Sequence, residues 1–177
     1  MTTERLFFAL WPDERLQGEL AQRLPPLAAA VGGRAQRPDQ WHVTLEFLGA
    51  VTSERQPAVW DAADRVVAAP FEVVFDALDH WRHPQVYCLA ATRTPAPLAQ
   101  LVEQLRTGLA LMGFAPETRS YRPHVTLARK VRTAQPEPLP GPLRWPADRF
   151  ALVRSVTDPA GSRYEPLRWW NLRGRGG

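Results

Sequence analysis

Hydrophobic and polar residues alternate along this chain with two different periods. A period of two, in which successive side chains point to opposite faces of a strand, predicts strands at residues 4–10, 42–48, 71–78, 85–92, 124–128, 150–157 and 164–172. Apolar residues three and four positions apart predict helices at residues 12–24, 53–69 and 95–112. Elements in this order favour two α/β sandwich lobes over a parallel doubly wound sheet.

Prolines set two further expectations about these elements. Pro25 and Pro26 predict the end of the first helix, because proline has no backbone N–H and clashes with the preceding turn. Residues 133–146 hold Pro136, Pro138, Pro140, Pro142 and Pro146. This density predicts an irregular loop in place of a sheet strand.

One tetrapeptide occurs twice. His42-Val43-Thr44-Leu45 and His124-Val125-Thr126-Leu127 each contain one of only four histidines in the chain. The interval between them is too long for a solenoid repeat, so the pattern indicates an internal duplication. Two similar lobes, each contributing one histidine to a shared cleft, account for it.

Strand parity turns this repeat into a candidate active site. His42 and Thr44 share one face of their strand, whereas Val43, Leu45 and Phe47 are predicted to point the other way. A histidine transfers protons near neutral pH, and a threonine hydroxyl binds an anionic oxygen. A lone strand histidine more often has a structural role, so the prediction depends on the pairing. Two such strands facing each other would hold a phosphate.

Further motifs extend this pattern over nearly the whole chain. They are Arg5-Leu6-Phe7-Phe8-Ala9 followed by Pro12, then Arg37-Pro38, the run from His42 to Gly49, and Pro123-His124-Val125-Thr126-Leu127-Ala128-Arg129. In combination they resemble the two-histidine phosphoesterase superfamily, and within it the bacterial and archaeal RNA 2′,3′-cyclic phosphodiesterases, also called 2′-5′ RNA ligases. The resemblance implies an α+β fold with pseudo-two-fold symmetry. Two antiparallel sheets would face a central cleft, with helices on the outer faces, in one bilobal domain over residues 1–177.

The same resemblance implies a reaction. RNA ending in a 2′,3′-cyclic phosphate would be hydrolysed to a 2′-phosphomonoester, with reverse joining to a 2′-5′ linkage when a 5′-hydroxyl replaces water. His42 would be the general acid that releases the 3′ oxygen, and His124 the general base. Thr44, Thr126 and Arg129 would bind the phosphate, and neither a metal nor another cofactor would be needed.

Two residues do not follow simply from this scheme. Strict alternation places Arg129 on the face opposite His124, so its participation requires the strand to end or twist there. Glu46 departs from the family pattern, in which a basic or neutral residue is more usual. By parity it faces the same way as His42, and we expect it to tune that histidine or to repel the substrate backbone.

Charge and composition agree with a nucleic-acid substrate. The net charge is +4 and the isoelectric point is near 10.0, and a basic cluster brackets the second motif: Arg119, Arg122, Arg129, Lys130 and Arg132. This cluster is either an approach path for RNA or an ordinary solvated surface. No apolar run is long enough to cross a membrane, the N-terminal residues do not have the pattern of a signal peptide, and the single cysteine, Cys88, cannot form an internal disulfide. We therefore expect a cytoplasmic monomer.

Several alternatives remain open from sequence. His80 and His83 form a His-x-x-His pair, but no supporting cysteine or carboxylate pattern favours a metal site. Aromatic residues that could stack on a terminal base are Trp11, Trp41, Trp81 and Tyr121. The same chemistry could serve a small cyclic phosphate or a 2′-5′-linked oligonucleotide, and the fold could also be a non-catalytic RNA-binding module.

Overall fold

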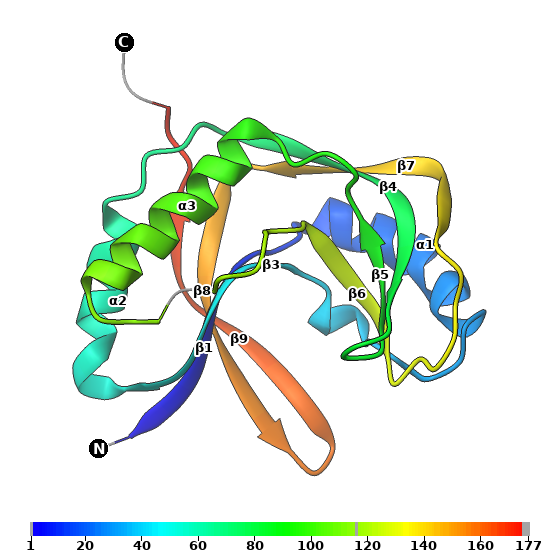
Figure 1. Cartoon of the computed structure of the whole chain (residues 1–177), viewed down its shortest axis with the longest axis horizontal. Coiled ribbons are helices and arrows are strands. Elements are labelled where there is room, and N and C mark those ends of the chain that lie inside the picture. Colours follow the sequence, from blue (N-terminus) through cyan, green and yellow to red (C-terminus); the bar gives the residue numbers. More distant parts are fainter. Residues whose placement is uncertain (1, 116, 175–177) are drawn as a thin grey trace.

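The computed structural model describes residues 2–115 and 117–174 (Figure 1). Its strands are β1 (Thr3–Leu10), β2 (Arg34–Ala35), β3 (Val43–Thr52), β4 (Phe71–Trp81), β5 (Val86–Ala90), β6 (His124–Arg129), β7 (Glu137–Ala147), β8 (Arg149–Asp158) and β9 (Gly161–Asn171). Its α-helices are α1 (Glu14–Ala29), α2 (Gln56–Asp64) and α3 (Ala96–Leu111), with 3₁₀ turns at Pro38–Gln40 and Ser53–Arg55.

The strands form two antiparallel sheets, which confirms the predicted α+β class. One sheet has the order β3-β1-β8-β9 and the other β2-β6-β5-β4-β7. The first copy of the repeat therefore lies at the start of an edge strand, β3. The second lies on β6, which pairs with β5 along one side and with β2 along the C-terminal half of the other.

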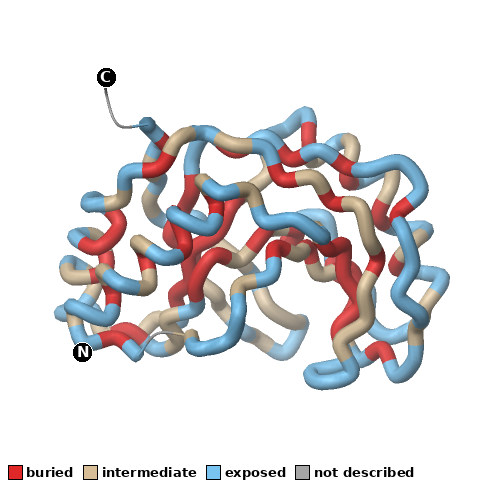
Figure 2. Tube along the Cα trace, turned by 45° about the horizontal axis from the view of Figure 1, so that its top comes forward, coloured by how far each residue is buried: buried red, intermediate tan, exposed pale blue. Residues whose placement is uncertain are grey.

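Helices α1 and α3 each contact the sheet that does not contain the strand before them in the chain. α1 follows β1 in the chain but packs against β6 of the other sheet, and α3, which precedes β6, contacts β3 and packs on α2 (Figure 1). The apolar face of α1 buries Leu16, Leu20 and Leu24, a spacing that keeps them on one side of the helix. Buried segments run through both sheets (Figure 2). Most buried apolar residues form one large core, and Phe7, Ala9, Ala151 and Val153 form a second, smaller cluster.

Two proline-based expectations are wrong. α1 continues through Pro25 and Pro26 to Ala29, because Leu24 and Ala28 are both buried in the core and their packing outweighs the lost hydrogen bonds. The proline-rich stretch contains a strand, β7, which pairs only with β4 at a sheet edge. An edge strand tolerates proline because half of its N–H groups face away from the neighbouring strand.

Both motif strands carry a β-bulge at the leucine of the repeat. On β3, Phe8 is opposite Glu46 and Ala9 is opposite Thr44, so Leu45 is the extra residue. On β6, Tyr87 is opposite Ala128 and Cys88 is opposite Thr126, which leaves Leu127 as the extra residue. A bulge shifts the alternation of faces by one residue, so parity after each leucine is reversed relative to the sequence prediction.

Among the described residues, no helix combines the length and the apolar character that a membrane crossing requires.

Candidate active site

His42 is held in a defined tautomer at the entrance to β3. Its Nδ1 lies 2.7 Å from the carbonyl oxygen of Gln40, and since a carbonyl only accepts, Nδ1 carries the proton. Its Nε2 lies 3.0 Å from the Thr44 hydroxyl, as the shared face of His42 and Thr44 predicts. In the neutral ring Nε2 is therefore the basic atom, and the threonine hydroxyl is beside it.

His124 has the same arrangement at the start of β6. Its Nδ1 donates to the carbonyl oxygen of Arg122 at 2.8 Å, and this residue precedes the histidine by two, as Gln40 precedes His42. The matched bonds leave Nε2 of both rings as the atom that exchanges a proton. The duplication seen in the sequence is thus also a duplication of the bond that orients each histidine ring.

Burial lowers the pKa of both histidines. The pKa of His42 falls from 6.5 to about 4, first because burial disfavours the charged ring and then because His124 and Arg129 repel the added charge. Burial is also the main cause that lowers the pKa of His124, with Arg122 and Arg129 adding repulsion. The positive charge of Arg129 thus contributes to the lowered pKa of both rings.

The bulges decide which other residues join the histidine faces. The bulge at Leu127 reverses the alternation on β6, so Arg129 lies on the same face as Thr126. Strict alternation had placed Arg129 on the opposite face, and the bulge removes that obstacle to a role in phosphate binding. The bulge at Leu45 likewise reverses the alternation on β3. The prediction that Phe47 points away from the histidine face is therefore wrong. Phe47 lies on the histidine face, 62% exposed, with its ring 5.6 Å from that of Phe7. Phe47 and Arg129 thus occupy equivalent positions, five residues after each histidine.

An aromatic wall surrounds His42. The ring of Trp11 stacks on it at 5.6 Å with an interplanar angle of 10°, and the rings of Phe7 and Tyr164 lie 5.0 and 5.1 Å away. The ring of Phe47 contacts that of Phe7 and so adds a fourth ring to this aromatic group. These rings reduce the contact of the half-buried histidine with water, which is the main cause of its lowered pKa, and the exposed ring of Phe47 lies beyond Phe7.

The surroundings of His124 are different. The ring of Trp81 lies 4.4 Å from that of His124, and its Nε1 donates to Asp79 at 2.9 Å. The guanidinium group of Arg122 also donates to Asp79, at 2.6 Å, and lies 5.1 Å from the centre of the Trp81 ring. One tryptophan packs on each histidine, but the second one belongs to a charged cluster.

Comparison with known proteins fits this site. The family model described as the 2′-5′ RNA ligase superfamily matches residues 12–159, a span that contains both histidines. The chain belongs to this superfamily. It is 32% identical to an RNA 2′,3′-cyclic phosphodiesterase of Escherichia coli over 96% of the chain and 97% of the relative. It is 30% identical to an RNA 2′,3′-cyclic phosphodiesterase of Thermus thermophilus over 98% and 92%.

Two solved structures have a similar fold over nearly the whole chain. A crystal structure described as a phosphoesterase superposes with a TM-score of 0.85 at 30% identity, over 97% of this chain and 99% of that one. E. coli LigT complexed with 3′-AMP superposes with a TM-score of 0.84 at 29% identity, over 97% and 99%. The family resemblance inferred from the motifs is confirmed.

Glu46 has a different orientation from the one that strand parity predicted. Because of the bulge at Leu45, Glu46 points away from His42 toward α3, and the expected influence on that histidine is wrong. The carboxylate is only 3% exposed, and both of its oxygens are bonded. One accepts from Nε of Arg106 at 2.7 Å, and the other from the backbone N–H of Glu117 at 2.9 Å.

The other residues singled out from the sequence do not join the two histidines. Trp41 is 3% exposed in the core, so it is not a stacking surface. His80 Nε2 donates to the carbonyl of Val131 at 2.9 Å, which gives it a structural role, and His83 is exposed in the β4–β5 turn. Within residues 2–115 and 117–174, no three His, Cys, Asp or Glu side chains are grouped as metal ligands. Cys88 is buried, and burial raises the pKa of its thiol to about 12.

Proposed function

We propose that this chain hydrolyses RNA ends that carry a 2′,3′-cyclic phosphate to 2′-phosphomonoesters by acid–base catalysis with two histidines. The observation that carries the proposal is the matched pair His42 and His124. Each ring donates through Nδ1 to the carbonyl two residues earlier, and each is followed two residues later by a threonine on the same face. The names of the E. coli and Thermus relatives support the same activity.

The proposed reaction moves two protons in one displacement. Neutral Nε2 of His124 removes a proton from water as the water oxygen attacks phosphorus in line. Protonated Nε2 of His42 gives its proton to the ribose 3′ oxygen as the P–O3′ bond breaks, which leaves the phosphate on the 2′ oxygen. We take this division of roles from the family resemblance. The anionic substrate favours the required imidazolium, because a negative charge offsets the burial that lowers the pKa of His42.

Three side chains would stabilise the phosphate as negative charge builds up on its oxygens. The Thr44 hydroxyl lies beside Nε2 of His42, and Thr126 has the equivalent position on β6. Arg129 acts electrostatically on both rings, so a phosphate between them would also feel its positive charge. Fixed donors and a cation of this kind supply transition-state stabilisation without a metal. With a 5′-hydroxyl in place of water, the reverse path would form a 2′-5′ linkage.

A small cyclic phosphate is the second candidate substrate, and the aromatic wall favours RNA over it. Phe47 presents an exposed ring on the histidine face, next to Phe7, Trp11 and Tyr164. Aromatic side chains commonly bind unpaired bases by stacking. A terminal nucleotide would place its base on this wall and its cyclic phosphate between the histidines. E. coli LigT forms a complex with 3′-AMP, which supports a nucleotide as a ligand of this fold.

Turnover of an oligonucleotide with a 2′,3′-cyclic phosphate end tests the proposal. After EDTA treatment the protein should remain active, and His42→Ala and His124→Ala should each lower turnover at least about a hundredfold. His83→Ala, which removes an exposed histidine outside the cleft, is the matched control and should keep full activity. Activity that survives the loss of either motif histidine, or that EDTA abolishes and a divalent ion restores, would refute the mechanism.

A further inference from the structure

The first motif lies on a strand whose outer edge is not covered by another strand. Within the part of the chain that the structure describes, β3 pairs only with β1, so the backbone groups on its other side need different partners. The segment that connects α3 to β6 contacts this edge twice. The Tyr121 hydroxyl donates to the backbone carbonyl oxygen of Thr44 at 3.0 Å, and the Glu117 N–H donates to the side-chain carboxylate of Glu46 at 2.9 Å. Residues just before His124 thus bind the strand that follows His42.

We propose that Tyr121 and Glu46 are positioning residues that hold the first motif in register with the second across the cleft. The proposal rests on the proposed function, since it concerns the geometry of the same two histidines. Tyr121 precedes His124 by three residues and bonds directly to Thr44. A shift of one motif relative to the other would therefore have to break this bond or move both strands together.

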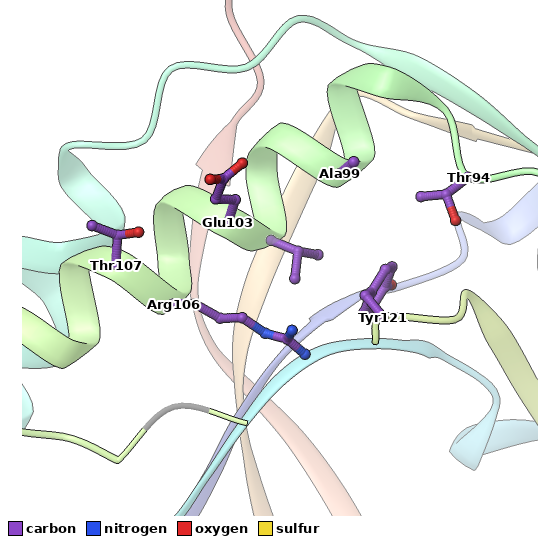
Figure 3. Close-up of a pocket in the computed structure, with 7 residues that line it drawn as sticks. Thr94, Ala99, Glu103, Arg106, Thr107 and Tyr121 are labelled. Atoms are coloured by element: carbon purple, nitrogen blue, oxygen red, sulfur yellow. The ribbon is translucent and has the colours of Figure 1, made fainter. Parts of the chain in front are cut away.

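Arg106 anchors the same segment to α3. Its Nε donates to Glu46 at 2.7 Å, and its Nη1 donates to the carbonyl oxygen of Arg119 at 3.2 Å. Figure 3 shows Arg106 projecting from α3 and Tyr121 from the chain before β6, at the border of a cavity of about 290 Å³. The carboxylate, the guanidinium group and the phenol thus join α3, β3 and the approach to β6.

The physical reason for such a connection is the sensitivity of proton transfer to distance. A catalytic group displaced by about 1 Å can lose about a hundredfold in rate, even when the protein remains folded. A backbone ladder would fix β3 by itself, but here the outer edge depends on a few side-chain bonds. The Tyr121 bond is the most specific of these, because its acceptor belongs to Thr44 of the motif.

Tyr121→Phe tests the proposal, because it removes one oxygen and keeps the packed ring. We expect kcat to fall about tenfold, the order of one lost hydrogen bond, with KM and the melting temperature nearly unchanged. Tyr87→Phe is the control, since it removes the hydroxyl of a different tyrosine, which is buried on β5. Hydrogen exchange should become faster in β3 and stay unchanged in β6.

A double-mutant cycle shows whether Tyr121 acts through the motif. In the Thr44→Ala background, the effect of Tyr121→Phe on kcat should shrink well below tenfold, because part of what it positions is gone. Wild-type kcat in Tyr121→Phe, or the full effect in both backgrounds, would overturn the inference. If instead His42→Ala is fully active, the proposed function fails, so the two failures are distinguishable.

Discussion

The two copies of the tetrapeptide have the same local structure and different support. In both, Nδ1 of the histidine donates to the carbonyl two residues earlier, and the leucine forms a bulge. On β6 the carbonyl of Leu127 accepts from the backbone N–H of Gln36, beside β2, whereas on β3 the carbonyl of Thr44 accepts from a tyrosine side chain. Four residues determine the local geometry, but the surrounding fold determines how it is held in place.

The residues after the two bulges differ in chemistry. Phe47 and Arg129 occupy equivalent positions, one aromatic and one cationic. A symmetric site would bind a phosphate in two orientations. In the reaction that we propose, this asymmetry would favour one orientation, with the base on the side of Phe47 and the phosphate charge facing Arg129.

The largest expected effect comes from removing the side-chain bonds that hold the outer edge of β3. Glu46→Gln leaves Arg106 without its ionic partner in a buried setting and should lower the free energy of unfolding by about 3 kcal/mol. Glu72→Gln removes an exposed ion pair with Arg144 and should cost less than about 1 kcal/mol. Urea unfolding of the two variants measures the difference. Equal losses would mean that the Glu46 network does not stabilise the edge.

The next effect concerns Arg129 on the other side. Gly33 has a φ of +77°, and a Cβ there would lie 2.5 Å from the carbonyl oxygen of Arg129. Gly32 has a φ of +70° and open space around it. Both alanine variants add backbone strain, but only Gly33→Ala should displace Arg129 and lower turnover, by about tenfold relative to Gly32→Ala. Equal turnover by the Gly33→Ala and Gly32→Ala variants would show that the position of Arg129 does not affect the reaction.

Phe47→Ala should have a smaller and more selective effect. Loss of one stacked base costs about 1 to 3 kcal/mol, so KM for an RNA end should rise about tenfold or more. Ribose 2′,3′-cyclic phosphate, which has no base, should react as with the unmodified protein. Leu111→Ala removes another exposed apolar side chain, on α3, and serves as the control. A KM increase for both substrates would contradict the stacking role.

A further prediction concerns stability as a function of pH. The pKa of His42 is about 4 in the folded protein and near 6.5 when unfolded, so the unfolded chain takes up the proton first. Stability should therefore fall as the pH decreases from about 6.5 to 4, with no further loss from this group below that. His42→Asn should flatten the fall in melting temperature, and His83→Asn should leave it unchanged. An unaltered profile in His42→Asn would show that His42 titrates normally.

Much of the fold and the histidine pair could be predicted because alternation and repetition are local properties of the sequence. Parity failed at Phe47 and Glu46, since neither bulge contains a glycine or proline that would mark it. β7 was missed because proline excludes an interior strand but is allowed at an edge, and the sheet order is a tertiary property. The role of Tyr121 also depends on a contact between distant segments, which no local pattern indicates.

The central claim is that the two histidines open the cyclic phosphate in one geometry, with water opposite the 3′ oxygen. Phosphorus NMR of the product from an RNA end with a 2′,3′-cyclic phosphate, recorded in the presence of EDTA, tests it most directly. We predict a single 2′-phosphomonoester signal, because in-line attack in one substrate orientation breaks only the P–O3′ bond. A 3′-phosphate, a mixture of the two isomers, or unreacted cyclic phosphate would contradict it.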